Sequence, residues 1–322
     1  MMTEELQNVI DCFAAQVSDP FPQYIFRKEI LRETPSHSEC AAIKKSKWYQ
    51  QLTEDQWENG SWGRFHTQDT KTLRVQKFVT TEFALRRARD LSLERDDPII
   101  QKTIGLMERY LRDEEAWPDT IEKHDGFVIS FKTLIAANLA IFDPHHPLLS
   151  SKREVCATNL AKAITSGFPD EGIWEQENRK SNDILLRLFM VYPIWLLQNN
   201  HFLPDDLQRL FLAWIWHRKD GIYYINNIAS SSIRSLENKD FGGWLAGLEN
   251  LSDFPLFSEF MNQGNAAHLL HENHRLMTED VALPPAAPIM GHYSEKWTQK
   301  NARQNDLILR ILRILDKARP RQ

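Results

Sequence analysis

The 322-residue sequence is poor in glycine, and this shortage excludes several classes of protein. It contains 12 glycines, about half of the share in an average protein. Sheet proteins need many glycine-rich turns, and phosphate-binding loops need glycines that let the backbone approach a ligand closely. The composition therefore favours a helical protein without a glycine-rich nucleotide loop.

Cysteine and long apolar runs are also scarce. Cys12, Cys40 and Cys156 are odd in number and far apart, and no Cys-x-x-Cys pair occurs. This pattern predicts reduced thiols and no disulfide framework or zinc site. The first residues, Met1 to Glu5, lack the basic and apolar parts of a secretion signal, and no apolar run is long enough to cross a membrane. We therefore expect a cytoplasmic protein without an integral membrane segment.

The charges are nearly balanced and are spread along the chain. Lys and Arg number 39, Asp and Glu number 44, and the net charge is −5. No basic stripe with interleaved aromatics appears, so nucleic acid is not an expected partner. Only the tail is locally basic, and we expect its basic residues to form a solvated face of a terminal helix. These residues are Arg310, Arg313, Lys317, Arg319 and Arg321.

Apolar residues recur at helical spacing along most of the chain, whereas alternating strand patterns are lacking. The expected helices cover 5–17, 24–32, 36–52, 78–93, 98–112, 127–142, 152–165, 182–198, 205–217, 230–251 and 297–317. Stretches 127–142, 184–197 and 210–216 are apolar on nearly all sides, so other elements must surround them. Their alternation with amphipathic helices predicts an inner and an outer layer.

A turn with glycine followed by an aromatic residue recurs between these helices. Gly60, Gly126, Gly172 and Gly221 each follow Asn or an acid and precede an aromatic residue within two positions, and Gly291 begins a fifth copy without the acid. Glycine supplies the positive φ that ends a helix or tightens a turn. Such turns at the spacing of helical hairpins indicate a repeat array, open or closed.

The segment Gln56-Trp-Glu-Asn-Gly60-Ser-Trp62 resembles the QW repeat of squalene–hopene cyclases and protein prenyltransferase β-subunits. Residues 80–87 resemble the inner helix that follows such a repeat. The resemblance covers residues 40–110 well and 110–300 weakly. It implies an all-α fold, an α/α toroid of five or six helical hairpins around a central cavity. Residues 1–322 would then form one domain, with 1–32 as an N-terminal helical extension and 297–319 as a closing helix.

The catalytic motifs of these families are missing. No Asp-x-Asp-Asp or Asp-Asp-x-x-Asp occurs, and the pairs Asp96-Asp97 and Asp205-Asp206 stand where helices are expected to begin. Cys156 has no His or Asp at a ligand spacing along a helix. We therefore expect no metal and no cofactor, although the run His268, His271 and His274 leaves a metal site open.

Several polar and aromatic residues are candidates for a site on the inner helices. Glu82 and Asp183 are the preferred catalytic residues, because an acid at the cavity end of an inner helix can act as a general acid. Aromatic side chains there would either stabilise a cation by cation–π contact or fill the core. The candidate substrate-binding residues are Arg64, His66, Phe127, Glu175, Trp195 and Arg234.

Three functions follow from this pattern. The resemblance implies a terpenoid-cyclase-like enzyme that acts on a small apolar, isoprenoid-type molecule in the cavity by non-standard acid chemistry. The alternative is a carbohydrate-active α/α toroid, a lyase or hydrolase in which Trp stacks on sugars and carboxylates do acid–base work. The third is a binding or scaffolding module without chemistry. The sequence leaves the substrate and the oligomeric state open.

Overall fold

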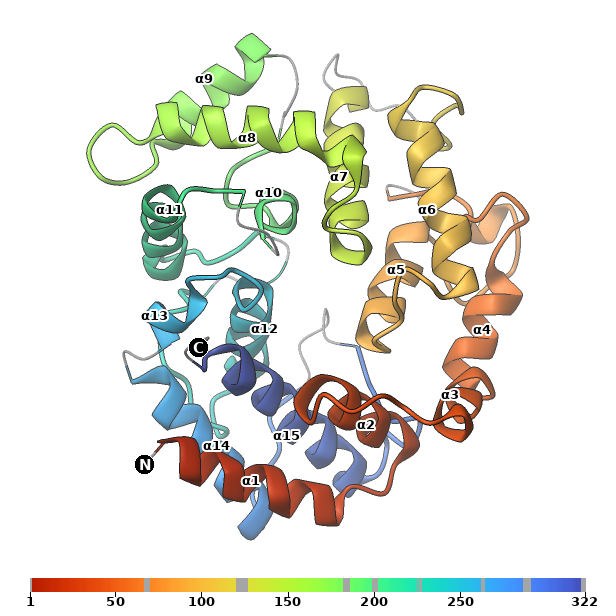
Figure 1. Cartoon of the computed structure of the whole chain (residues 1–322), viewed down its shortest axis with the longest axis vertical. Helices are drawn as coiled ribbons and strands as arrows, with labels where there is room; N and C mark the ends of the chain where they lie inside the picture. Colours follow the sequence, from red (N-terminus) through yellow and green to blue (C-terminus); the bar gives the residue numbers. More distant parts are fainter. Residues whose placement is uncertain are drawn as a thin grey trace. The chain divides into compact units, whose positions relative to one another are not determined.

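The computed structural model describes residues 2–66, 70–119, 127–181, 186–198, 202–223, 225, 228–261, 264–285 and 291–319, with only the backbone at 2–3 and 127–128. These residues contain fifteen α-helices and no strand, so the all-α prediction is confirmed (Figure 1). The contacts between its residues divide the chain into two compact units. Unit 1 consists of Met1–Ser46 and Leu212–Gln322, and unit 2 is Lys47–Phe211.

Unit 2 is organised around a helix that is apolar on all sides. This helix, α7 (Phe127–Phe142), packs against α5 (Thr81–Asp90), α6 (Pro98–Leu111) and α10 (Val191–Leu197), and Figure 1 shows it beside them. Its bounds agree with the prediction, as does its burial among other helices. The other elements of unit 2 are α4 (Lys47–Asp55), η2 (Thr70–Thr72), η3 (Pro147–Leu149), α8 (Ser150–Ala163), α9 (Glu171–Ser181) and the first half of α11 (Asp205–His217).

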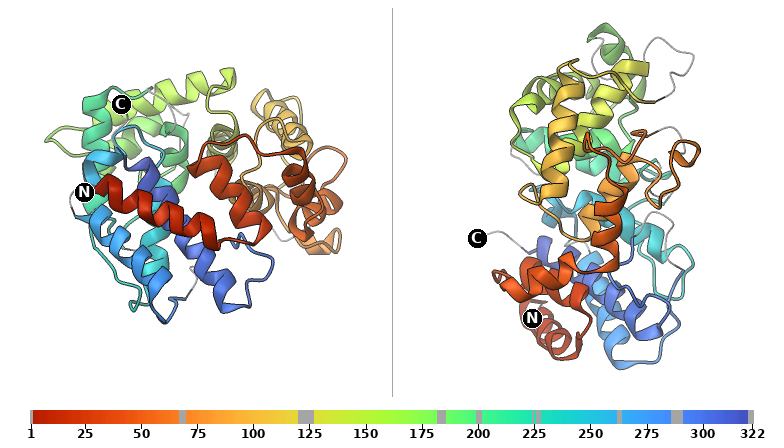
Figure 2. Two further views of the ribbon diagram at one scale, coloured as in Figure 1. Left: turned by 60° about the horizontal axis from the view of Figure 1, so that its bottom comes forward. Right: turned by 90° about the vertical axis from the view of Figure 1, so that its right-hand side faces the viewer.

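Unit 1 joins the two ends of the chain. Its C-terminal helix α15 (Lys300–Lys317) packs against α1 (Met2–Gln16), α2 (Pro20–Ile25) and the π-helix η1 (Phe26–Ile30), so the predicted N-terminal extension and closing helix share one core (Figure 2). The remaining elements are α3 (His37–Lys44), the second half of α11, α12 (Phe241–Leu251), α13 (Phe257–Met261) and α14 (Asn265–Thr278).

The largest differences from the predicted helices occur in three stretches, each of which includes residues that are not helical. Stretch 36–52 forms two helices, α3 and α4, and Ser36 caps α3 in a reciprocal capping box with Glu39. Of 182–198 only α10 is helical among the described residues; Pro193 has no N–H to donate, and it is tolerated because it stands in the first turn. Stretch 230–251 becomes helical only at α12, because the side chain of Asn238 holds the N–H of Asp240 in a turn.

The complete QW-type turn ties the end of α4 to α6. Gly60 has φ +94°, and a Cβ there would lie 2.5 Å from a backbone oxygen of α6. The Gln56 amide donates to Thr103 on α6 at 3.1 Å, and the Trp62 indole donates to the carbonyl of Leu52 at 2.8 Å. Gln56 therefore holds the turn against α6, and Trp62 holds it against α4.

The other glycine turns are less uniform than expected. Gly221 has φ +58° and fits the prediction. Gly172 does not, because it lies in the first turn of α9, and neither Gly172 nor Gly291 has a positive φ. Gly126 lies outside the described residues. The glycine-aromatic pattern therefore marks two turns of the predicted kind, at Gly60 and Gly221, in the described part of the chain.

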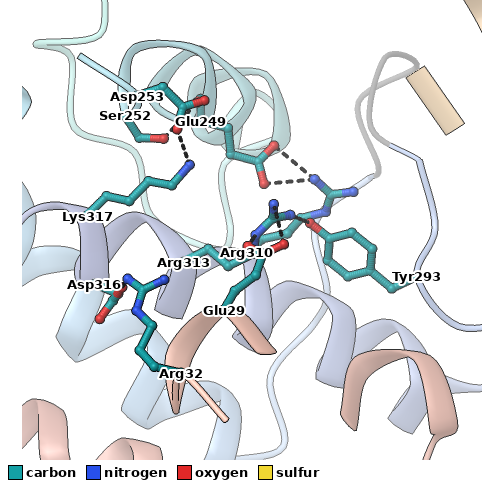
Figure 3. Close-up of polar contacts among 10 residues, drawn as sticks. All are labelled: Glu29, Arg32, Glu249, Ser252, Asp253, Tyr293, Arg310, Arg313, Asp316 and Lys317. Atoms are coloured by element: carbon teal, nitrogen blue, oxygen red, sulfur yellow. Dashed lines mark hydrogen bonds and ion pairs between the residues drawn. The ribbon is translucent and has the colours of Figure 1, made fainter. Parts of the chain in front are cut away.

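The basic residues of α15 are not a solvated face, which corrects the prediction. Arg310 is buried, and its Nη1 donates to both carboxylate oxygens of Glu249, at 2.8 and 2.9 Å, while its Nη2 donates to the carbonyl of Gly291. Arg313 is half-buried and binds Glu29 of η1 at 2.7 Å. Both guanidinium groups flank the ring of Tyr293, at 4.4 and 5.6 Å from its centroid (Figure 3). Glu249 and Glu29, which lie on other helices, thus pair with these arginines, and the ion pairs hold α15 in unit 1.

Candidate acid–base site in unit 2

A buried carboxylate in the first turn of α5 is the centre of the candidate site. Glu82 is only 3% exposed. Three side chains donate hydrogen bonds to it: those of His66, Arg86 and Tyr192. We call these four residues the Glu82 cluster. A buried carboxylate needs such donors, because it would otherwise lose its hydration without compensation.

The four side chains come from three parts of unit 2. Arg86 stands one turn after Glu82 on α5, and its Nη2 donates to Oε1 at 3.0 Å. The hydroxyl of Tyr192 on α10 donates to the same oxygen at 2.8 Å. Nδ1 of His66, on the loop after the QW-type turn, contacts the other carboxylate oxygen. The Tyr192 hydroxyl also lies 3.4 Å from Nδ1, so the three groups share one polar centre.

The backbone around His66 is fixed on both sides. The carboxylate of Asp119 accepts the N–H groups of Phe65 and His66, at 2.6 and 2.8 Å. The carbonyls of Arg64 and Phe65 accept the first two N–H groups of α5, at 2.9 and 3.0 Å. These donors have no partner within their own helix. The start of α5 and the His66 loop therefore satisfy each other, which holds the imidazole against Glu82.

The charges of the central pair reinforce each other. Burial alone would raise the pKa of Glu82, but the hydrogen bond from His66 and the charge of Arg86 outweigh it and hold this pKa below its ordinary value. Burial would likewise lower the pKa of His66, but the hydrogen bond and charge of Glu82 outweigh burial and raise it. Both directions favour a carboxylate bound to an imidazolium.

Aromatic rings surround the imidazole. Its centroid lies 6.1 Å from the ring of Phe131 on α7 and 6.1 Å from that of Tyr192, both edge-on. Phe131 packs against Trp117 at 4.2 Å, and Tyr192 packs against Trp195 at 5.6 Å. The side chain of His66 nevertheless remains 29% exposed. No described residue hydrogen-bonds to its Nε2, on the side of the ring away from Glu82. This nitrogen is the group of the cluster best placed to exchange a proton with a ligand.

The structure joins some of the predicted site residues. Glu82 and His66 are in direct contact, and Arg64 lies two residues before His66. Trp195 packs against the ring of Tyr192, which belongs to the cluster. The side chain of Phe127 and the whole of Asp183 lie outside the described residues.

Two other predicted residues lie elsewhere. Glu175 is partly exposed on α9, where its described contacts are weak ion pairs with Arg179 and Arg187, at 3.8 and 3.9 Å. Arg234 belongs to unit 1, and its carbonyl accepts a hydrogen bond from His268 at 2.7 Å. Glu175 has no described contact with the Glu82 cluster.

Sequence reasoning missed the roles of three residues at this site. The spacing of Glu82 and Arg86 is that of an ion pair on one helix face, so this contact was open to prediction. Asp119 lies in the loop after α6, and Tyr192 lies among the apolar residues of α10. Their contacts with His66 and Glu82 span 53 and 110 residues. No local sequence pattern predicts contacts between residues so far apart in the chain.

The described pockets lie in unit 1. One of about 650 Å³ is lined by residues of α1 and α14, among them Val9, Cys12, Leu270 and His271. A second of about 280 Å³ lies beside α15, next to Asp306, whose pKa is raised to about 7 by burial. Neither pocket contains a residue predicted for substrate binding or catalysis.

The histidine run on α14 provides no metal centre within the described residues. Among them, no group of three or more His, Cys, Asp or Glu side chains is arranged to hold an ion. His268 instead binds the carbonyl of Arg234 and lies 3.7 Å from Glu272. The described chain also has no helix long and apolar enough to cross a membrane.

Comparison with known proteins adds no family assignment. No protein family, curated protein or solved structure matches the chain. The chemistry of the site is therefore inferred from its geometry.

Proposed function

We propose that the Glu82 cluster is an acid–base site at which His66 exchanges a proton with a substrate. The observation that carries this proposal is the contact of one buried carboxylate with an imidazole, a guanidinium and a phenol. Convergent titratable groups with shifted pKa values are typical of catalytic sites.

Glu82 serves in this proposal as a positioning residue. Its lowered pKa keeps it ionised near neutral pH, so it is a poor proton donor. An ionised carboxylate at Nδ1 holds a proton on that nitrogen and leaves Nε2 to give or take a proton. The general acid predicted at Glu82 is thus assigned to its partner, His66.

The substrate class we propose is a small apolar, isoprenoid-type molecule with a reactive oxygen. An imidazolium is too weak an acid to protonate an alkene, whereas it can protonate an alcohol, an epoxide or a departing phosphate oxygen. Phe131, Trp117 and Trp195 pack around His66 and Tyr192, and their rings would make cation–π contacts with a carbocation that develops there. This is the non-standard acid chemistry of a terpenoid-cyclase-like enzyme. An α/α toroid of five or six hairpins is the arrangement we propose for it, supported by the QW-type turn and by the all-round burial of α7.

A carbohydrate lyase is the second candidate, and the side-by-side arrangement of Tyr192, His66 and Arg86 favours it. Removal of a proton next to a sugar carboxylate needs a base, for which the imidazole or phenol is suited. It also needs a cation that stabilises the negative charge that develops on the carboxylate, for which the guanidinium is suited.

Turnover assays distinguish the two candidates. Wild type and His66→Gln are incubated with isoprenoid alcohols, epoxides and diphosphates, and products are identified by mass spectrometry. In parallel, uronate polymers are followed through the ultraviolet absorbance of unsaturated products. We expect turnover in one of the two sets and a loss of about 10²-fold or more in His66→Gln, the usual contribution of a general acid or base.

A matched control is Glu175→Gln, which removes a partly exposed carboxylate on α9 and should leave turnover unchanged. Equal turnover by wild type and His66→Gln would contradict the assignment of His66. Absence of turnover in both sets, with tight binding of an isoprenoid or uronate that depends on His66, would instead support a binding module.

A further inference from the structure

The loop before α5 exposes two aliphatic side chains. Leu73 is 59% exposed and Val75 is 94% exposed, which makes them the most exposed large hydrophobic residues in the described chain. They stand two residues apart in the segment Lys71–Lys77, which begins within η2 and which we call the 71–77 loop (Figure 2). Two strongly exposed aliphatic side chains so near each other in sequence are candidates for contact with another apolar phase.

Hydrogen bonds hold the 71–77 loop in one conformation, in which its aliphatic side chains are exposed. Arg74 Nη2 donates to the carbonyl of Glu54 at 2.7 Å. The Gln76 amide donates to a backbone carbonyl of the QW-type turn at 2.8 Å. The carboxylate of Asp55 accepts the N–H of Lys77 at 2.8 Å. These bonds hold the polar groups of the loop against α4 and the turn after it, while the two aliphatic side chains point into solvent.

The same loop carries only positive charge. Lys71, Arg74 and Lys77 are all exposed, and no acid occurs between 71 and 77. In a protein with a net charge of −5, this local excess of cations favours an anionic partner.

A half-buried tryptophan extends the basic surface. Trp48 on α4 has three cations near its ring, Arg87, Lys77 and Lys47, at 4.5, 5.2 and 5.9 Å from the centroid. Tryptophan and basic side chains together are the residues that anchor proteins at the boundary between lipid headgroups and acyl chains.

We propose that the 71–77 loop docks the protein onto an anionic lipid surface. Leu73 and Val75 enter the outer acyl region, while Lys71 and Lys77 contact phosphate groups. Two aliphatic side chains between cations are too small a patch for a stable protein interface, which buries about 800 Å² on each partner. A nucleic acid would bind the cations through its phosphates but would provide no apolar region for Leu73 and Val75. Docking of this kind needs no helix that crosses the bilayer, and it does not depend on the proposed chemistry at His66.

Sedimentation with lipid vesicles tests the proposal on the full chain. We expect the protein to sediment with vesicles of phosphatidylcholine and phosphatidylserine but not with pure phosphatidylcholine, and to be released by high salt. The double variant Leu73→Ser, Val75→Ser should lose about tenfold in affinity or more, since two side chains no longer enter the apolar region. Lys71→Gln with Lys77→Gln should lose about fivefold per charge at low salt.

Phe168→Ser is the matched control, because Phe168 is another exposed hydrophobic residue of unit 2, at 55% exposure, in the loop between α8 and α9. It should bind vesicles like wild type. All variants change exposed side chains, and circular dichroism verifies that they fold.

Three results would overturn the proposal. The first is no sedimentation of the wild type with anionic vesicles, and the second is equal binding by wild type and the Leu73→Ser, Val75→Ser variant. The third is equally tight, salt-sensitive binding to polyglutamate or DNA that ignores the aliphatic pair, which would identify the surface as a general polyanion site.

Discussion

Replacing Glu82 by Gln should destabilise the protein in a pH-dependent manner. The change keeps the size of the side chain but removes the charge that faces His66 and Arg86. Loss of one partner from a buried ion pair typically costs about 3 to 5 kcal/mol. Here both cationic partners are half-buried and keep some contact with water, so we expect about 2 to 3 kcal/mol near pH 6.

The sign of the pH dependence follows from the two shifted groups. The folded pKa of Glu82 lies below its ordinary value of 4.5, so its contribution is present above that pH and is lost as the pH falls through the folded pKa. The folded pKa of His66 lies above its ordinary 6.5, so its contribution is full below 6.5 and is lost as the pH rises through the folded pKa. The difference between wild type and variant should therefore be largest between these two limits.

Urea unfolding followed by circular dichroism from acidic to alkaline pH measures this difference. Glu175→Gln, which removes a partly exposed carboxylate from weak ion pairs, is the control and should change the free energy of unfolding by less than about 0.5 kcal/mol. The reasoning is refuted if Glu82→Gln is as stable as wild type near pH 6, or if the difference between them does not vary with pH.

Two further predictions concern the helix contacts that hold each unit together. Gly60→Ala should lower the free energy of unfolding by more than about 3 kcal/mol, because it combines a positive φ with a Cβ that meets the backbone of α6. The control, Gly167→Ala, has φ +89° but no atom within 4 Å of the added Cβ, so it should cost only about 1 kcal/mol. Equal losses in thermal or urea unfolding would contradict the contact with α6. Glu29→Gln should cost about 2 kcal/mol, because it removes the carboxylate that binds the half-buried Arg313 guanidinium at 2.7 Å. A loss no larger than that of Glu175→Gln in the same assay would show that this ion pair contributes nothing.

The helical class and several helices could be predicted because their patterns are local. The apolar period of 127–142 and the Asp-Asp start at 205 gave the bounds of α7 and α11 as the structure has them. The errors also have local causes. Pro193 and Asn238 restrict the backbone, yet the apolar pattern continues across both positions, and the predicted helices were extended too far.

The candidate site could be predicted only in part. Glu82 and His66 were found because both lie close to the QW-type turn in sequence. Tyr192 and Asp119 reach the same centre from distant parts of unit 2, and their side chains are also common in helical cores and loops. Which of many buried polar residues share a centre depends on tertiary packing, which a single sequence does not reveal.

The central claim is that Glu82 holds His66 as an imidazolium ready to exchange a proton. The most direct test is the pKa of His66, measured by nuclear magnetic resonance from the pH dependence of its ring proton signals and assigned with His66→Gln. We predict a pKa above the ordinary 6.5 in the wild type and a fall below that value in Glu82→Gln, where burial acts without the carboxylate. A wild-type pKa at or below 6.5, or one that Glu82→Gln leaves unchanged, would contradict the account.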